Sequence, residues 1–150
     1  AEETGQSIKD IHAMVIGGHG DYMVPLTRFC TVNGVPAGTF LDVESIARIN
    51  KRTRHAGAEV LPLRQLSSAY NAPAAAIATM VDTICHNRRR VLPCVCNLDG
   101  EYGQNDITAG VPAIIGRNGI EKIVELPLDD AEQAGFQASI DSICADLKNL

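Results

Sequence analysis

The sequence predicts an α+β domain in which an antiparallel sheet with hairpins packs against long helices. Apolar segments of strand length are joined by Asn33-Gly34 and by Asn118-Gly119, two pairs that are typical of tight hairpin turns. The segments with helical spacing do not alternate with these strands, as they would in a parallel sheet. Residues 1–150 have the length of one domain, so we expect a single unit.

Three strands are expected before the first helix. Residues 8–16 form an apolar run that enters a glycine-rich turn, and residues 23–32 form the second run. Pro25 cannot donate a ladder hydrogen bond, so we expect a bulge or a sheet edge there. After the turn at Asn33-Gly34, residues 35–40 return as a short third strand.

The first helix is expected to begin at Asp42, whose carboxylate can cap it, with Glu44 placed favourably for the helix dipole. Pro62 should break or kink this helix near its end. An apolar stripe with helical spacing predicts the inward face: Ile46, Ile49, Thr53, Ala56, Val60 and Leu63. The opposite face is interpreted as solvated rather than as a nucleic-acid surface: Arg48, Lys51, Arg52, Arg54 and His55.

A second helix is predicted over residues 72–86, with Asn71 as its cap. It is apolar on nearly every side, and Asp82 is its only acidic residue. A helix of this kind is typically buried on most sides, so we expect it to pack against other elements or another subunit. His86 and the arginines at 88–90 suit the negative end of the helix dipole.

The C-terminal part is expected to contain a hairpin sheet and a final helix. Three strands are predicted: 91–98, 107–115 and 120–126. Asp129 and Glu132 form a variant of the capping box that begins the helix, and Gly135 inside it costs roughly 1 kcal/mol relative to alanine. The apolar stripe of this helix is Phe136, Ile140, Ile143, Leu147 and Leu150.

The composition is that of a soluble globular domain, with 45% hydrophobic and 21% charged residues. A net charge of -5 argues against a nucleic-acid partner. No segment reaches the roughly 20 apolar residues that span a bilayer, and no signal peptide is recognised. We therefore expect a cytoplasmic protein without a nucleic-acid or membrane partner.

The five cysteines are interpreted as buried free thiols. An odd number of cysteines, spread widely along the chain, does not fit a disulfide framework. Cys94 and Cys96 would lie on one face of a strand, but no other Cys or His pair stands at the spacing of a zinc site. No metal is therefore expected.

Three glycines surround one histidine after the first apolar run, in the order Gly17, Gly18, His19, Gly20, followed by Asp21. Glycines allow a sharp turn and the close approach of other groups. A histidine titrates near neutral pH, so it can accept and return a proton. The alternative is a loop or core histidine whose hydrogen bonds are satisfied.

The segment at 17–26, Gly-Gly-His-Gly-Asp-Tyr-Met-Val-Pro-Leu, resembles the active-site histidine segment of the malate and lactate dehydrogenases. It is more similar to the malate enzymes of lactate-dehydrogenase-like type. Further matches lie at 68–76, 100–107, 110–116 and 119–123, in the same order and spacing. The resemblance therefore covers nearly the whole chain.

The resemblance implies the C-terminal substrate domain of such an enzyme. The implied cofactor is NAD, bound mainly by a Rossmann domain that would precede Ala1 and would also supply the family's orienting aspartate and substrate-binding arginines. The chain has no Gly-x-Gly-x-x-Gly between a strand and a helix, so no complete cofactor site is expected in it. The other expected partners are malate or oxaloacetate and further copies of the chain in a homo-oligomer.

By the same resemblance, His19 is the catalytic residue that accepts the hydroxyl proton of malate and returns it in the reverse reaction. The residues that match the substrate and nicotinamide pocket are Gly18, Gly20, Ser68, Ala69 and Pro73. The alternative for Ser68, Ala69 and Pro73 is a helix start that packs and caps.

The chain alone is expected to lack malate dehydrogenase activity, because it carries one catalytic group and no cofactor domain. Three other functions remain open. The chain could be a non-catalytic assembly module of the same fold or part of a lactate dehydrogenase. A metal-dependent hydrolase that uses His12, His19 and an acid is the third.

Overall fold

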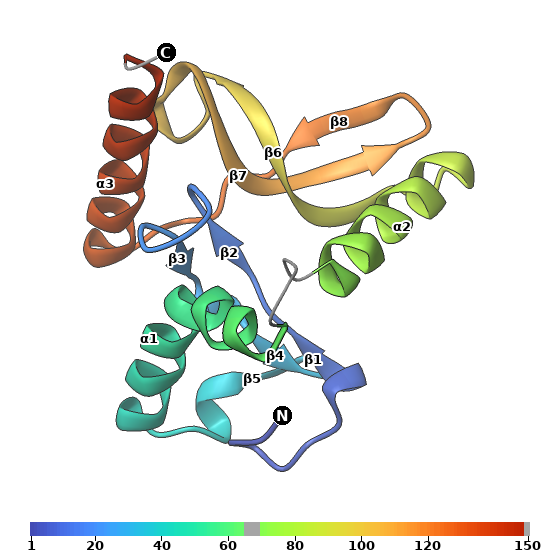
Figure 1. Cartoon of the computed structure of the whole chain (residues 1–150). Helices are drawn as coiled ribbons and strands as arrows, with labels where there is room; N and C mark the ends of the chain where they lie inside the picture. Colours follow the sequence, from blue (N-terminus) through green and yellow to red (C-terminus); the bar gives the residue numbers. More distant parts are fainter. Residues whose placement is uncertain (65–69, 149–150) are drawn as a thin grey trace.

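The computed structural model describes residues 1–64 and 70–148. Its largest sheet is antiparallel, with the order β6-β7-β8, and lies between α3 at one end and α2 at the other (Figure 1). The strands are β6 (Arg90–Asp99), β7 (Asn105–Gly116) and β8 (Gly119–Ile123). This confirms the predicted α+β class with an antiparallel hairpin sheet.

The turn between β7 and β8 is displaced by one residue from its predicted position. Gly116 pairs with Gly119, so Arg117 and Asn118 occupy the turn. Gly119 has a φ of +91°, in the left-handed region that glycine adopts without strain. The pairing register shifts between Ile114 and Ile115, which indicates a bulge beside the turn.

The N-terminal strands are shorter than predicted. One sheet has the order β1 (Ile11–His12), β4 (Thr31–Val32), β5 (Val35–Pro36), and a separate pair joins β2 (Val15–Ile16) to β3 (Val24–Pro25). The expected continuous strands over 8–16 and 23–32 are wrong, because each run contains a single 3-10 turn and is divided between the two sheets. The turn at Asn33-Gly34 is confirmed, with φ values of 47° and 85°.

Helix α1 (Val43–Val60) begins as predicted, since the Asp42 carboxylate accepts a hydrogen bond from the Ser45 amide at 2.8 Å. The α-helix ends before Pro62, which lies in a 3-10 segment, Leu61–Arg64. The predicted break is therefore confirmed. The predicted inward face is only partly correct: Ile46, Ile49 and Thr53 are half-buried, Ala56 and Val60 are exposed, and the side chain of Leu63 lies outside the described set.

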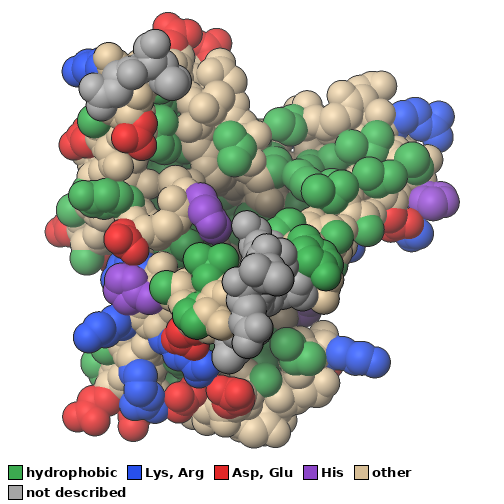
Figure 2. All heavy atoms as spheres, in the orientation of Figure 1, with side chains coloured by type: hydrophobic (Ala, Val, Ile, Leu, Met, Phe, Trp, Pro, Cys, Tyr) green, Lys and Arg blue, Asp and Glu red, His purple; other side chains and the backbone are tan. Residues whose placement is uncertain are grey.

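Helix α2 (Asn71–Cys85) corrects two expectations. Asn71 is its first residue rather than its cap, and Tyr70 precedes it without a capping side-chain bond. Burial on most sides is also wrong, since Ile77 is 61% exposed and only Thr83 is fully buried. Figure 2 shows hydrophobic side chains gathered over this helix. Among the described residues, α2 packs mainly against β7.

Helix α3 (Asp130–Leu147) begins with the predicted capping box of Asp129 and Glu132. Phe136 and Ile140 are buried, whereas Leu147 is 54% exposed and Leu150 lies outside the described residues. The core joins α3, the sheet and the β2–β3 hairpin: Ile16, Val24, Leu26, Cys96, Leu98, Tyr102, Ile107, Ala109, Val111, Ala113, Phe136 and Ile140.

The cysteines are free thiols, as predicted, but their expected burial holds fully only for Cys96. Cys85 is exposed, and Cys30, Cys94 and Cys144 are half-buried. None of the helices in the described part of the chain has the length and hydrophobicity needed to span a bilayer.

Candidate active site: a histidine on a glycine turn

The glycine turn joins β2 to β3 and is fastened to β7. Gly17 donates a hydrogen bond to the Gly110 carbonyl at 2.8 Å and accepts one from the Gly110 amide at 2.9 Å. The φ values of Gly17 and Gly20 are +91° and +111°, a region that is strained for other residues. The turn leads into a strand, as predicted. It is closed by a hydrogen bond that the Met23 amide donates to the Gly20 carbonyl oxygen, with an N···O distance of 3.1 Å.

A second support comes from α3. The Gly18 amide donates a hydrogen bond to the Ser139 hydroxyl oxygen at 2.6 Å. Ser139 is fully buried, and a Cβ atom added at Gly17 would lie 2.6 Å from this oxygen. The close approach of the turn to α3 therefore requires a glycine at position 17.

His19 lies between these fixed points and its side chain is exposed. The exposure excludes a packed core histidine, one of the two alternatives to a functional role, and leaves the other, a loop histidine. Its imidazole is accessible to a molecule in solution, as a proton acceptor must be.

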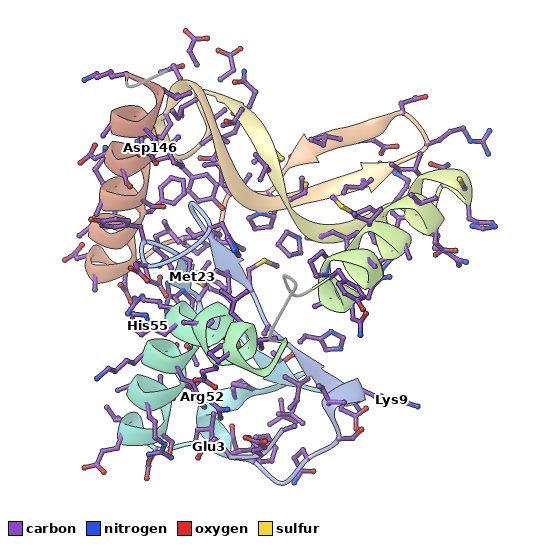
Figure 3. All side chains as sticks on the ribbon, viewed as in Figure 1. Glu3, Lys9, Met23, Arg52, His55 and Asp146 are labelled. Carbon is purple, nitrogen blue, oxygen red and sulfur yellow. The ribbon has the colours of Figure 1, made fainter. Side chains whose placement is uncertain are left out.

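The Asp21 carboxylate lies beside α1. It lies 3.4 Å from the His55 Nδ1 atom, and the Arg54 guanidinium donates a hydrogen bond to the Met23 carbonyl at 3.1 Å. Met23 and His55 both lie where α1 approaches the turn (Figure 3). Asp21 therefore contacts α1 at the side of the turn.

Arg28, a basic residue close to the turn, is already engaged by protein groups. Its guanidinium donates to the Glu132 carboxylate and to the Pro127 carbonyl, both at 2.6 Å, and lies 3.7 Å from Asp129. The hydrogen bond with Glu132 raises the pKa of Arg28 above its ordinary value. This arginine fixes the start of α3 to the segment after β3.

Of the predicted pocket residues beyond the turn, the structure describes Pro73. Pro73 is exposed in the first turn of α2, whereas Gly18, His19 and Gly20 form the turn itself. Ser68 and Ala69 lie outside the described residues. The structure thus brings together the three residues of the turn and places Pro73 on a separate helix.

The cavities lined by described residues include two that border the N-terminal half. One of about 690 Å³ separates the first residues of the chain from α1, and its rim carries the ion pairs Arg48–Glu3 at 2.6 Å and Arg52–Glu2 at 3.2 Å. The other, of about 230 Å³, is lined by residues that include Asp21 and Arg54. His19 is not among the described lining residues of either cavity.

The sequence analysis missed Gly110 and Ser139 as supports of the turn. A glycine inside a strand indicates a close backbone approach, so Gly110 carried a usable signal. Ser139 carried none, because a serine among apolar helix residues has many roles and its partner is 121 positions away.

Comparisons with known proteins match the whole chain. The family model for the lactate/malate dehydrogenase alpha/beta C-terminal domain matches residues 1–150. A malate dehydrogenase from Nitrosococcus oceani is 58% identical over the entire chain, which covers 48% of that protein. One from Thioalkalivibrio sulfidiphilus is 57% identical, with 49% of that protein covered. The chain thus spans about half the length of these relatives.

The fold agrees with solved structures. The malate dehydrogenase of Salinibacter ruber superposes with a TM-score of 0.94 and 41% identity, over 99% of this chain and 48% of that one. The lactate dehydrogenase of Eimeria maxima with NADH and oxamate superposes equally well, at 37% identity, over 99% of this chain and 46% of the other. The chain belongs to the lactate/malate dehydrogenase family, as its alpha/beta C-terminal domain.

Proposed function

We propose that this chain is the substrate domain of an NAD-dependent malate dehydrogenase and that His19 transfers the proton. The observation that carries the proposal is an exposed imidazole on a turn fixed by β7 and α3. When malate is oxidised, the His19 imidazole accepts the hydroxyl proton as the carbon loses a hydride. In the reverse direction protonated His19 returns that proton to the carbonyl oxygen of oxaloacetate.

NAD supplies the hydride acceptor when it is bound. The glycine turn of this chain continues into β3 and not into a helix, so it does not form the dinucleotide cradle of a strand–glycine–helix motif. We assign NAD binding mainly to a separate Rossmann half. The chain contributes the residues that border the nicotinamide and substrate: Gly18, Gly20, Ser68, Ala69 and Pro73.

The decisive experiment joins this chain to the N-terminal half of the Nitrosococcus oceani malate dehydrogenase. The fusion is expected to oxidise malate with NAD, whereas the chain alone does not. His19→Asn should lower kcat of the fusion about 10²- to 10⁴-fold, because it removes the proton acceptor. His12→Asn, which alters an exposed histidine on β1, is the control and should leave kcat unchanged.

Full activity in the His19→Asn fusion would show that the chain is an assembly module. A larger kcat/KM for lactate than for malate would assign it to the lactate enzymes instead.

We further propose a cytoplasmic homo-oligomer, which sedimentation of the fusion and fractionation of the source cells would test. A single-subunit mass in sedimentation would contradict the oligomer.

A further inference from the structure

Helix α3 approaches the β2–β3 hairpin along one row of residues spaced by four. Gly135, Ser139 and Ile143 make up this row. A Cβ atom at Gly135 would lie 3.2 Å from the Val24 side chain, and one at Gly18 would lie 3.6 Å from the Ile143 side chain. Residues four apart share a helix face, so the β2–β3 hairpin packs against one face of α3.

Ser139 is the polar member of this row. Within the described residues, it is the only member of the row whose side chain makes a hydrogen bond to the turn. Its hydroxyl oxygen is fully buried and accepts the Gly18 amide directly before His19. Gly17 is fixed on the other side by its two hydrogen bonds with Gly110. The Gly17–Gly18 peptide, one residue before His19, is therefore held from two directions.

We propose that Ser139 is a positioning residue that sets the direction of the His19 imidazole. This inference rests on the proposed role of His19. Loss of the hydroxyl leaves the Gly18 amide without its acceptor and allows the Gly17–Gly18 peptide to rotate. The imidazole then leaves the productive geometry more often, and a misplacement of about 1 Å can cost as much as 10²-fold in rate.

The first test uses the chain itself. In Ser139→Ala we expect the Gly18 amide to exchange its hydrogen at least about tenfold faster than in the parent, because it opens more readily to solvent. The amides of Ile16 and Val24 should keep their parent exchange rates. Ser142→Ala, one position from the row on the same helix, is the matched control and should change none of these rates. Unchanged exchange at Gly18 in Ser139→Ala would overturn the proposed anchor.

The second test uses the fusion with the dinucleotide-binding half. Ser139→Ala should lower kcat for malate about tenfold with KM for NAD unchanged, because the change affects the proton-transfer geometry rather than cofactor binding. In the His19→Asn background, Ser139→Ala should have no further effect on kcat, since the group that it positions is gone. An equal loss in both backgrounds would show that Ser139 acts on stability alone and would overturn the inference.

The two proposals fail in different ways. Full activity of His19→Asn removes the proposed function, whereas full activity of Ser139→Ala with inactive His19→Asn removes only the role of Ser139. If Ser139→Ala does not fold, Ser139→Cys replaces it, because a thiol has similar size and is a much weaker hydrogen-bond acceptor. A Ser139→Cys fusion with parent kcat would then contradict the inference.

Discussion

Two glycines from distant parts of the chain meet backbone to backbone beside the candidate active site. A Cβ atom at Gly110 would lie 2.7 Å from the Gly17 carbonyl oxygen, a backbone atom that cannot move aside cheaply. We therefore expect Gly110→Ala to lower the free energy of unfolding by about 1–3 kcal/mol. Urea denaturation followed by circular dichroism measures this change.

Gly57→Ala is the opposite case and serves as the control. Gly57 lies in α1, and a Cβ atom there meets no other atom within 4 Å. The change should raise the free energy of unfolding by about 0.5–1 kcal/mol, because alanine favours the helix. Equal stability of Gly110→Ala and the parent would show that the strand separates from the turn without cost.

Because the Cys96 thiol is buried, we expect the free energy of unfolding to depend on pH in the alkaline range. Burial, together with the neighbouring Cys94 thiol at 3.6 Å, raises the pKa of Cys96 from 9.0 to about 12. In the unfolded chain this thiol ionises with the ordinary pKa of 9.0. The contribution of the protonated thiol to the free energy of unfolding is therefore fully present below pH 9.0 and is lost as the pH rises toward about 12.

The free energy of unfolding of Cys96→Ala should accordingly fall less steeply with pH than that of the parent between pH 9.0 and about 12, the two pKa values of the thiol. Urea titrations at several pH values give the two slopes. Cys85→Ala, which alters an exposed thiol, should retain the parent slope. Parallel slopes for Cys96→Ala and the parent would contradict this account.

At the scale of elements, the start of α3 depends on its capping box. The Asp129 carboxylate accepts a hydrogen bond from the Glu132 amide, and the Glu132 carboxylate accepts one from the Asp129 amide, both at 2.9 Å. Asp129→Ala should therefore cost about 1 kcal/mol of unfolding free energy. Thermal or urea denaturation measures the loss, and Asp130→Ala, inside the first turn, should cost less. A loss below that of Asp130→Ala would rule out the cap as a stabilising feature.

Two helix caps and one hairpin turn were predicted correctly because their chemistry is local, whereas the cap at Asn71 was wrong and the second hairpin turn was displaced by one residue. Asp42, Asp129 and Asn33-Gly34 act on neighbours within a few positions, so their effect is visible in a short window. The N-terminal strands were predicted poorly for the converse reason. A two-residue strand such as β1 exists only through its pairing with a segment farther along the chain, Ile11 with Val32, and no local pattern specifies that pairing.

The burial of α1 and α2 was overestimated for a related reason. An apolar stripe shows which side of a helix is less polar, but it does not show whether the same chain supplies a layer to cover it. Ile77 and Val81 of α2 are more than half exposed although the helix is apolar on nearly every side. The same applies to the candidate site. The sequence predicted the glycine turn, but it did not predict that Ser139 on α3 anchors this turn.

At the scale of the molecule, the core contains residues from the hairpin and from the C-terminal sheet and helix together. Ile16 and Val24 lie in one cluster with Val111 and Phe136. We therefore expect a single cooperative unfolding transition. The ring signals of Tyr102, in the sheet region, and of His12, on β1, should vanish at the same urea concentration in NMR spectra. Separate midpoints would show that the N-terminal sheet unfolds on its own.

The bond between Gly18 and Ser139 also bears on biosynthesis. It joins positions 121 residues apart, so the bend that carries the imidazole lacks its final support until the last helix has left the ribosome. A nascent chain stalled before Ser139 would therefore contain the whole histidine motif in the correct order and still have no fixed orientation for its ring.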